Sequence, residues 1–261
     1  VKYAYDDGAL PFSVLLGSSQ ILLLKRIRET LAGRVSLFEL WPLMMSEIHE
    51  EPSGGVPVAV HAPGTSLSPP LVDRLFTAAS LKDIFADIPG VLLDREDETA
   101  RRAEAYILQW GGMPGLLPLT DDERRQWLKD YGFTYLERDL RVALDVGNLA
   151  DFERFMRLCA ARTGQLLNKT ALARDAGIST KTTAAWLSAL QACNQLTLVT
   201  PWHGNLSKQL VKSPKLYFND PGLAAFLMGL DLSAVRSSPW SGALWETAVC
   251  AEIRKALSWR P

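Results

Sequence analysis

Several features are scarce in this 261-residue sequence, and each scarcity excludes a class of protein. No apolar run approaches the roughly eighteen residues that a membrane-spanning helix needs, so we expect no membrane segment. The three cysteines are scattered and lack Cys-x-x-Cys spacing, which predicts free thiols in a cytoplasmic protein and excludes a disulfide framework. The three histidines lie far apart in the chain, so the sequence offers no metal site.

The common nucleotide-binding and catalytic motifs are also absent. The sequence has no Gly-x-x-x-x-Gly-Lys-Ser/Thr phosphate loop, no Gly-x-Gly-x-x-Gly and no His-Glu-x-x-His. A phosphate loop supplies the backbone N–H groups and the lysine that hold the phosphates of a nucleotide. We therefore expect this chain alone to bind no cofactor tightly and to have no ATPase activity.

Charge is distributed unevenly along the chain. The net charge is −1, but residues 152–218 contain nine basic and two acidic side chains, which gives 9 − 2 = +7 for this segment and leaves −8 for the rest. A basic module in an acidic chain is typical of a protein that binds a phosphate backbone. The alternative is a basic face that docks on the acidic remainder of the same protein.

The order of predicted elements divides the chain into an α/β part and a helical part. A short apolar run at residues 12–17, a helix capped by Ser18 or Ser19, and a second run at residues 35–40 suggest the end of a parallel α/β sheet. A stretch rich in Pro, Gly and Ser at residues 51–70 is the best linker candidate. The remainder is predicted to be mostly helical, with helices at residues 71–85, 98–110 and 121–146 and a last helix from Trp240.

The most specific local pattern is a helix-turn-helix followed by a β-hairpin. Asn168 is expected to cap one short helix, Gly177 to end it in a left-handed turn, and Ser179 to cap a second helix over residues 180–192. Strands are predicted at residues 196–199 and 215–218. Helix, turn, helix and hairpin together are typical of a winged helix.

The outward residues of this unit are candidates for nucleic-acid contact. Short polar and basic groups suit entry into the major groove and contact with phosphates. No Arg, Asn or Gln extends from the start of the second helix, so base-specific reading is not predicted. The other possibility is a winged helix that contacts only protein. The candidates are Lys181, Thr182 and Ser188 on the helix and Lys208 and Lys212 near the wing.

The sequence resembles a prokaryotic AAA-type ATPase family along its whole length. Proteins of that family join an ATPase core to a C-terminal domain of unknown function that contains a winged helix and a nuclease-like fold. The resemblance rests on several short stretches that occur in the family's order. They are residues 13–20 (SVLLGSSQ), 31–34 (LAGR), 39–43 (ELWPL), 111–114 (GGMP), 134–139 (TYLERD), 163–168 (TGQLLN), 212–218 (KSPKLYF) and 242–246 (GALWE).

The resemblance implies a nucleotide site of which this chain carries only part. Ser18 or Ser19 matches the polar residue that faces the γ-phosphate, and Arg34 matches a cation near a phosphate. The residue types alone allow a helix cap and a helix-end charge at these positions instead. ATP and magnesium are implied for the full-length family member, whose phosphate loop would precede Val1.

The resemblance also implies a nuclease-like carboxylate near the C-terminus. Glu246 matches the first acidic residue of such a site, and the other acidic residues would follow Pro261. Glu252 cannot replace them, because six residues at about 100° each turn it some 120° away around a helix. Glu246 is thus expected to be an isolated, solvated carboxylate.

Together these observations predict an α/β remnant of a P-loop ATPase sheet followed by a mainly α winged-helix region. The expected domains are residues 1–50 (end of the ATPase core), 51–148 (linker and helical lid), 149–230 (winged helix) and 231–261 (start of a truncated nuclease-like domain). The expected function is that of an internal fragment of an AAA-type ATPase that binds double-stranded DNA or a protein partner and that could form oligomers. The alternatives are a stand-alone winged-helix regulator and a protein–protein adaptor.

Overall fold

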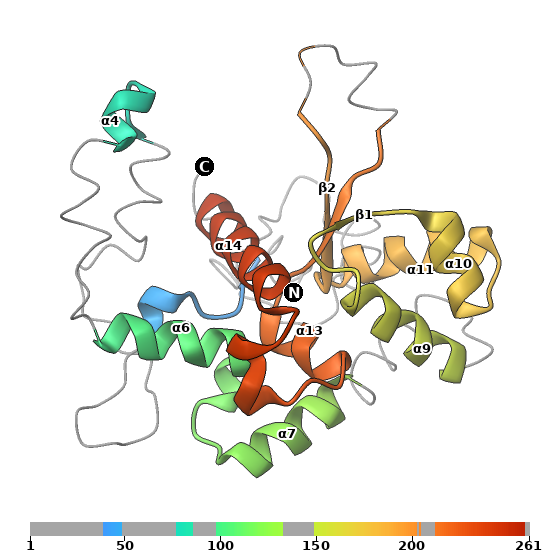
Figure 1. Cartoon of the computed structure of the whole chain (residues 1–261), viewed down its shortest axis with the longest axis horizontal. Coiled ribbons are helices and arrows are strands. Elements are labelled where there is room, and N and C mark those ends of the chain that lie inside the picture. The colour runs from blue at the N-terminus through green and yellow to red at the C-terminus, as the bar shows by residue number, and fades with distance from the viewer. Residues whose placement is uncertain are drawn as a thin grey trace, which may run out of the picture.

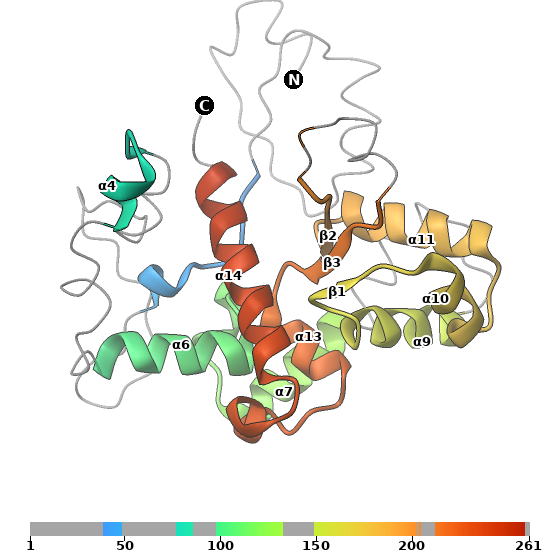
Figure 2. The ribbon, with the colours of Figure 1, turned by 45° about the horizontal axis from the view of Figure 1, so that its top comes forward.

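The computed structural model of the chain describes residues 39–48, 77–85, 98–132, 149–202, 204 and 212–258. These residues are mostly helical with one small sheet, as the sequence predicts (Figures 1 and 2). The predicted strand-helix-strand segment at residues 12–40 lies outside the described residues except for Glu39 and Leu40, which belong to no strand. None of the described helices is long and apolar enough to cross a bilayer.

The elements follow one another in this order: the 3-10 helix η1 (Met45–Glu47), α4 (Leu81–Phe85), α6 (Glu98–Trp110), η2 (Pro114–Leu116), α7 (Asp121–Asp130), α9 (Leu149–Ala160), β1 (Gln165–Leu166), α10 (Lys169–Ala176), α11 (Thr180–Ala192), β2 (Leu196–Val199), β3 (Lys215–Phe218), α13 (Pro221–Leu227), η4 (Leu232–Ser237) and α14 (Ser241–Ser258).

Helix α13 lies at the centre of the described structure, between α6, α9 and α14 (Figures 1 and 2). All of its residues except Phe226 are buried, because its sequence is apolar on every side. One hydrophobic cluster extends from Ile48 through α6, α7, α9, α10, α11, the sheet and α13 to α14. The three cysteines are free thiols, as predicted.

The helices α9, α10 and α11 and the sheet form one unit. Strand β3 is central and pairs antiparallel with both β1 and β2, so the strand order is β1-β3-β2. Trp186 of α11 packs edge-on against Phe152 and Phe155 of α9, at ring-centroid distances of 5.1 and 5.3 Å. The predicted bounds of α11, β2 and β3 are confirmed.

A buried carboxylate joins the end of α6 to the start of α13. Asp220 accepts hydrogen bonds from the N–H groups of Leu223 and Gly112, both at 2.8 Å. The backbones meet so closely there that a Cβ on Gly111 would lie 2.0 Å from Asp220 Oδ1, and one on Gly222 would lie 2.1 Å from the Gly111 nitrogen. Glycine is therefore required on both sides of this contact.

Residues 41–48, the N-terminal strap, belong to the predicted ATPase part and lie against α6 and α14. The N–H of Leu43 donates to Gly112 O (2.7 Å), and Leu43 O accepts from Lys255 Nζ (2.6 Å). Glu252 accepts from the N–H of Met45 (3.2 Å) and also pairs with Lys255 at 3.3 Å. Both charged side chains are nearly buried, so the strap is fixed by groups that only a folded α14 can present.

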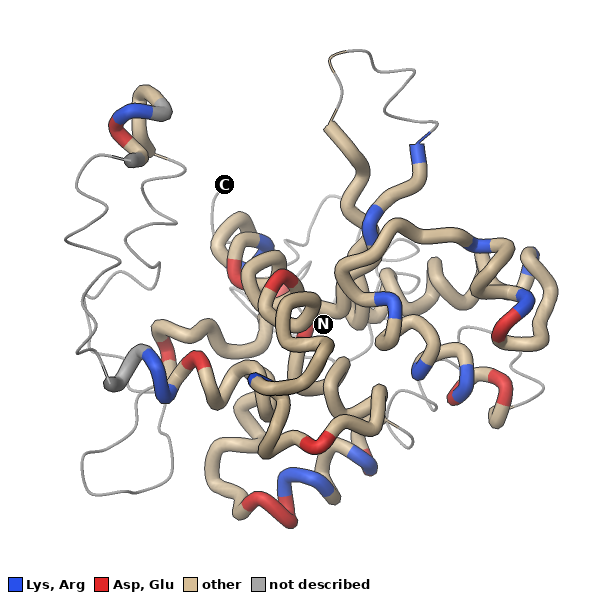
Figure 3. Tube along the Cα trace, in the orientation of Figure 1, with Lys and Arg blue, Asp and Glu red and all other residues tan. Residues whose placement is uncertain are grey.

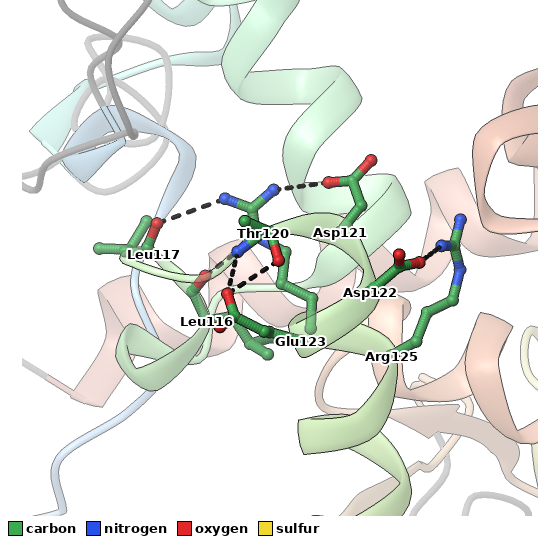
Figure 4. A network of polar contacts seen from close by, with 8 residues as sticks. Leu116, Leu117, Thr120, Asp121, Asp122, Glu123 and Arg125 are labelled. Carbon is green, nitrogen blue, oxygen red and sulfur yellow. Dashed lines mark hydrogen bonds and ion pairs between the residues drawn. The ribbon is translucent and has the colours of Figure 1, made fainter.

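A polar network holds helix α7 against the preceding η2 segment (Figure 4). Glu123 accepts hydrogen bonds from the N–H and the hydroxyl of Thr120, both at 2.8 Å, which caps the helix. Arg124 donates to Leu116 O (3.0 Å) and Leu117 O (3.3 Å) and pairs with Asp121 at 2.9 Å. Its guanidinium also lies 5.2 Å from the ring centroid of Tyr106.

Two predicted helices differ from those observed. The helix predicted at residues 71–85 is interrupted at residues 78–80, because the Ser80 side chain accepts the N–H of Asp83 (3.3 Å) and starts α4 at Leu81. The helix predicted from Asp121 has α-helical geometry only to Asp130. It then widens to a π-helical turn at Tyr131 and Gly132, and the residues that follow lie outside the described part.

Substituting Gly112 should displace the N-terminal strap. In Gly112→Ala the new Cβ would lie 2.3 Å from Leu43 O, so the backbones must separate. We expect a loss of about 1–3 kcal/mol in the free energy of unfolding, measured by urea denaturation. Gly242→Ala is the control, since nothing lies within 4 Å of a Cβ there and it should stabilise by at most about 1 kcal/mol. Equal stability of both variants would contradict this account.

Candidate nucleic-acid interface

The turn between α10 and α11 has the geometry that the sequence predicts. Asn168 Oδ1 accepts the N–H of Ala171 (2.9 Å), and Ser179 Oγ accepts the N–H of Thr182 (3.0 Å). Gly177 has φ 71°, the left-handed conformation that favours glycine. These local interactions fix the end of α10 and the start of α11, and they confirm the predicted caps.

Helix α11 presents one buried and one exposed face. The residues of the inward face are buried, and the Thr183 hydroxyl among them donates to Ser179 O (3.1 Å). That hydrogen bond lets a polar side chain occupy a core position that an apolar residue would usually fill. The buried residues are Thr183, Trp186, Leu187, Ala189 and Leu190.

The three predicted contact residues of α11 differ in their exposure and in the hydrogen bonds that their side chains already form. Lys181 is exposed and has no ion pair with any described residue. The Thr182 hydroxyl is half-buried and hydrogen-bonded to Ser179 Oγ (2.8 Å). Ser188 is exposed, but its hydroxyl donates to Ala184 O (3.0 Å). Lys181 is thus the helix residue best able to reach an anion.

Ion pairs engage more than half of the basic side chains of residues 152–218, the basic segment of the chain. Two of the four partner carboxylates, Glu153 and Asp175, are already counted in the net charge of +7, whereas Asp151 and Glu246 lie outside residues 152–218 and lower the charge by two. The pairs are Arg154 with Asp151, Arg157 with Glu153, Arg162 and Arg174 with Asp175, and Lys215 with Glu246.

Three lysines remain without an ion pair to any described residue: Lys169, Lys181 and Lys212. Lys169 is the first residue of α10, Lys181 the second residue of α11, and Lys212 lies three residues before β3. Lys208, the other predicted contact residue of the wing, lies outside the described residues. Figure 3 shows Lys and Arg along α9, α10 and the β3 side of the hairpin, with few acidic residues between them.

Glu246 is not the isolated carboxylate that the sequence suggests. It accepts hydrogen bonds from Lys215 Nζ (2.6 Å) and Tyr217 Oη (2.5 Å), both on strand β3. These two donors hold the pKa of Glu246 below its ordinary value, and the same contacts raise the pKa of Lys215. Sequence spacing could not show this because β3 and α14 meet only in the tertiary structure.

Comparison with known proteins assigns a family to most of this region. Residues 101–234, more than half of the chain, match the family described as "Domain of unknown function (DUF8612)". The chain belongs to this family. Residues 1–49 match the family described as "AAA domain", which suggests an AAA-type domain in that segment. No solved structure gives a significant match.

Two curated relatives of this DUF8612 chain come from mycobacteria. They are the uncharacterized protein Rv2008c of Mycobacterium tuberculosis and the uncharacterized protein Mb2031c of Mycobacterium bovis. Each is 28% identical over 197 residues, which is 75% of this chain and 44% of the relative. The matched part of the chain thus spans less than half the length of these relatives.

The candidate nucleotide-site residues belong to the segment that matches the AAA domain. Ser18, Ser19 and Arg34 all lie outside the described residues, so their geometry stays a prediction. Within the described ranges, no group of three His, Cys, Asp or Glu side chains could hold a metal ion.

Sequence reasoning missed two features of the DUF8612 chain, one beside the hairpin and one under the N-terminal strap. Trp202, which follows the hairpin strand β2, is 86% exposed. Its position beside Pro201 in a predicted turn was the sequence feature that could have indicated this exposure. The buried pair of Glu252 and Lys255 was missed because both residue types usually face solvent on a helix.

The contact of Glu246 with β3 should make stability depend on pH. The pKa of Glu246 is lower in the folded chain than in the unfolded chain. The contact therefore stabilises the folded chain fully above about pH 4.5, the ordinary pKa of a glutamate. This stabilisation is lost as the pH falls through the lowered pKa of the folded chain. Glu246→Gln should therefore be less stable than the natural chain at neutral pH and approach it in acid, measured by urea denaturation across the pH range. A difference that stays constant from neutral to strongly acidic pH would contradict this assignment.

Proposed function

We propose that this DUF8612 chain is part of an AAA-type ATPase whose residues 149–230 form a winged helix that binds double-stranded DNA. The element order α9-β1-α10-α11-β2-β3, with β3 between β1 and β2, supports the winged-helix assignment. The observation that carries DNA binding is the set of lysines without ion pairs. They stand at the starts of α10 and α11 and beside the hairpin, where phosphates can approach.

Binding to the DNA backbone follows from the residues that α11 offers. Lys181 lies in its first turn, where the positive end of the helix dipole adds to the attraction of a phosphate. Ala185 and Ser188 are too short to form bidentate contacts with base edges. We therefore infer weak binding with little sequence preference.

The match of residues 1–49 to the AAA domain favours this proposal over a stand-alone regulator, which needs no such segment. In the full-length protein, Ser18 or Ser19 and Arg34 would contact the phosphates of ATP with magnesium. The domain bounds 1–50, 51–148, 149–230 and 231–261 are part of the same proposal. The last of these would begin a nuclease-like domain, with Glu246 as its first carboxylate.

A protein–protein adaptor is the competing function. The specific observation in its favour is that five of the basic side chains are already paired with carboxylates, which lowers the charge available for phosphates. Salt dependence separates the two functions, since binding to DNA releases counterions.

Binding of a short duplex should weaken with salt in proportion to the lysines that meet phosphates. With three or four such lysines, each releasing roughly 0.9 counterion, the log–log slope should be about −3 to −4. Lys181→Ala and Lys212→Ala should each reduce the slope by about one, measured by fluorescence anisotropy over a series of salt concentrations.

Lys129→Ala is the matched control. Lys129 is exposed on α7, which lies on the opposite side of the molecule from the hairpin, and its removal should leave the slope unchanged (Figures 1 and 2). A slope near zero, or no binding of the natural chain at low salt, would favour the adaptor instead.

A further inference from the structure

Trp202 is the most exposed large aromatic side chain among the described residues. It is 86% exposed and stands three residues beyond Val199, the last residue of β2. Its described neighbours do not cover it: Pro201 is half-buried, and Gly204 has open space around the position of a Cβ. Tryptophan side chains are usually largely buried, and an exposed indole leaves a large apolar surface in water. A binding partner that covered this indole would remove that apolar surface from water.

The hairpin also carries a cation on the chain segment that leads into β3, opposite the segment that carries Trp202. The last pair of the β2–β3 ladder is Val199 with Lys215. Trp202 follows Val199 by three residues on one side of the hairpin, and Lys212 precedes Lys215 by three residues on the other. Lys212 is exposed and has no ion pair with a described residue. An exposed aromatic side chain and an exposed ammonium group therefore follow and precede the two paired strands of the hairpin.

This combination fits a nucleobase next to its phosphate. A base offers an apolar face to an indole, and the phosphate of the same nucleotide offers a charge to a lysine. In an intact duplex the faces of the bases are stacked on one another and closed to a side chain. They open where strands separate, at a mismatch, a fork or the border between duplex and single strand.

We propose that Trp202 stacks on an unpaired base, so that the winged helix prefers DNA in which a duplex meets a single strand. The inference rests on the proposed DNA-binding function and specifies its substrate. The lysines of α10 and α11 hold the duplex backbone, and the hairpin contacts the first unstacked base. The short side chains of α11 are consistent with this division, because the structure of the DNA is then recognised rather than its sequence.

The test compares two DNA probes by fluorescence anisotropy at low salt: a blunt duplex, and the same duplex extended by a single-stranded tail. The natural chain should bind the tailed duplex more tightly. Trp202→Ala should lose roughly five- to a hundredfold in affinity for the tailed duplex and keep its affinity for the blunt one. Trp202→Phe should retain part of the preference, since a smaller ring still stacks.

Trp245→Ala is the control, because Trp245 is also exposed (42%) but lies on α14. It should leave both affinities unchanged. A second measurement is tryptophan fluorescence, which stacking on a base quenches. The tailed duplex should quench the natural chain more than Trp202→Ala.

The outcomes distinguish this inference from the function on which it rests. If the natural chain binds no DNA at low salt, both fail. If it binds both probes equally, or if Trp202→Ala weakens both equally, DNA binding stands and the stacking role is wrong. If Trp202→Ala binds both probes like the natural chain, the indole does not contact DNA, and the inference is likewise overturned.

Discussion

The described structure depends on the place where the end of α6 meets the start of α13. The carboxylate of Asp220 is buried there and accepts hydrogen bonds from the backbone of Gly112 and Leu223. Burial raises the pKa of Asp220, and the backbone N–H groups act in the opposite direction because they favour the charged form. A side chain on Gly111 or Gly222 would occupy the space that this carboxylate and the α6 backbone fill. The contact thus fixes α13, around which the other helices pack.

Two surfaces are positioned from this centre. On one side, α13 contacts α9 and β3, and so orients the helix-turn-helix and its hairpin. On the other side, Gly112 and α14 hold the N-terminal strap through Leu43 and Met45. The strap lies within the segment that matches the AAA domain, and α6 lies largely within the DUF8612 match. The two family segments are therefore in direct contact, through the hydrogen bond of Leu43 with Gly112.

Local signals predicted the elements whose ends are fixed by local interactions. Asn168, Gly177 and Ser179 cap or end α10 and α11 through contacts within four residues, so the sequence located these helices and the following strands correctly. The helix at residues 71–85 was predicted to be continuous because the cap at Ser80, which starts α4, was overlooked.

Features that depend on distant residues could not be predicted in this way. The ion pair of Arg162 with Asp175 joins the chain just after α9 to α10, a contact between residues 13 positions apart that the sequence pattern does not show. Glu246 and Lys215 are 31 residues apart and meet only because α14 crosses β3. The placement of Lys255 under the strap depends on a contact across 212 residues.

The predicted interface residues have two different outcomes. Lys181 and Lys212 are exposed, as the proposal requires. The hydroxyl groups of Thr182 and Ser188 are already engaged in hydrogen bonds.

The central claim is that this chain binds DNA through α10, α11 and the hairpin. Hydrogen exchange of the chain with and without a tailed duplex at low salt tests it most directly, because it reports every backbone amide and needs no variant. The account predicts slower exchange upon DNA binding in the first turns of α10 and α11 and next to β2 and β3, with no change in α7. Protection confined to α7 or α14, or no change anywhere in the presence of DNA, would contradict it.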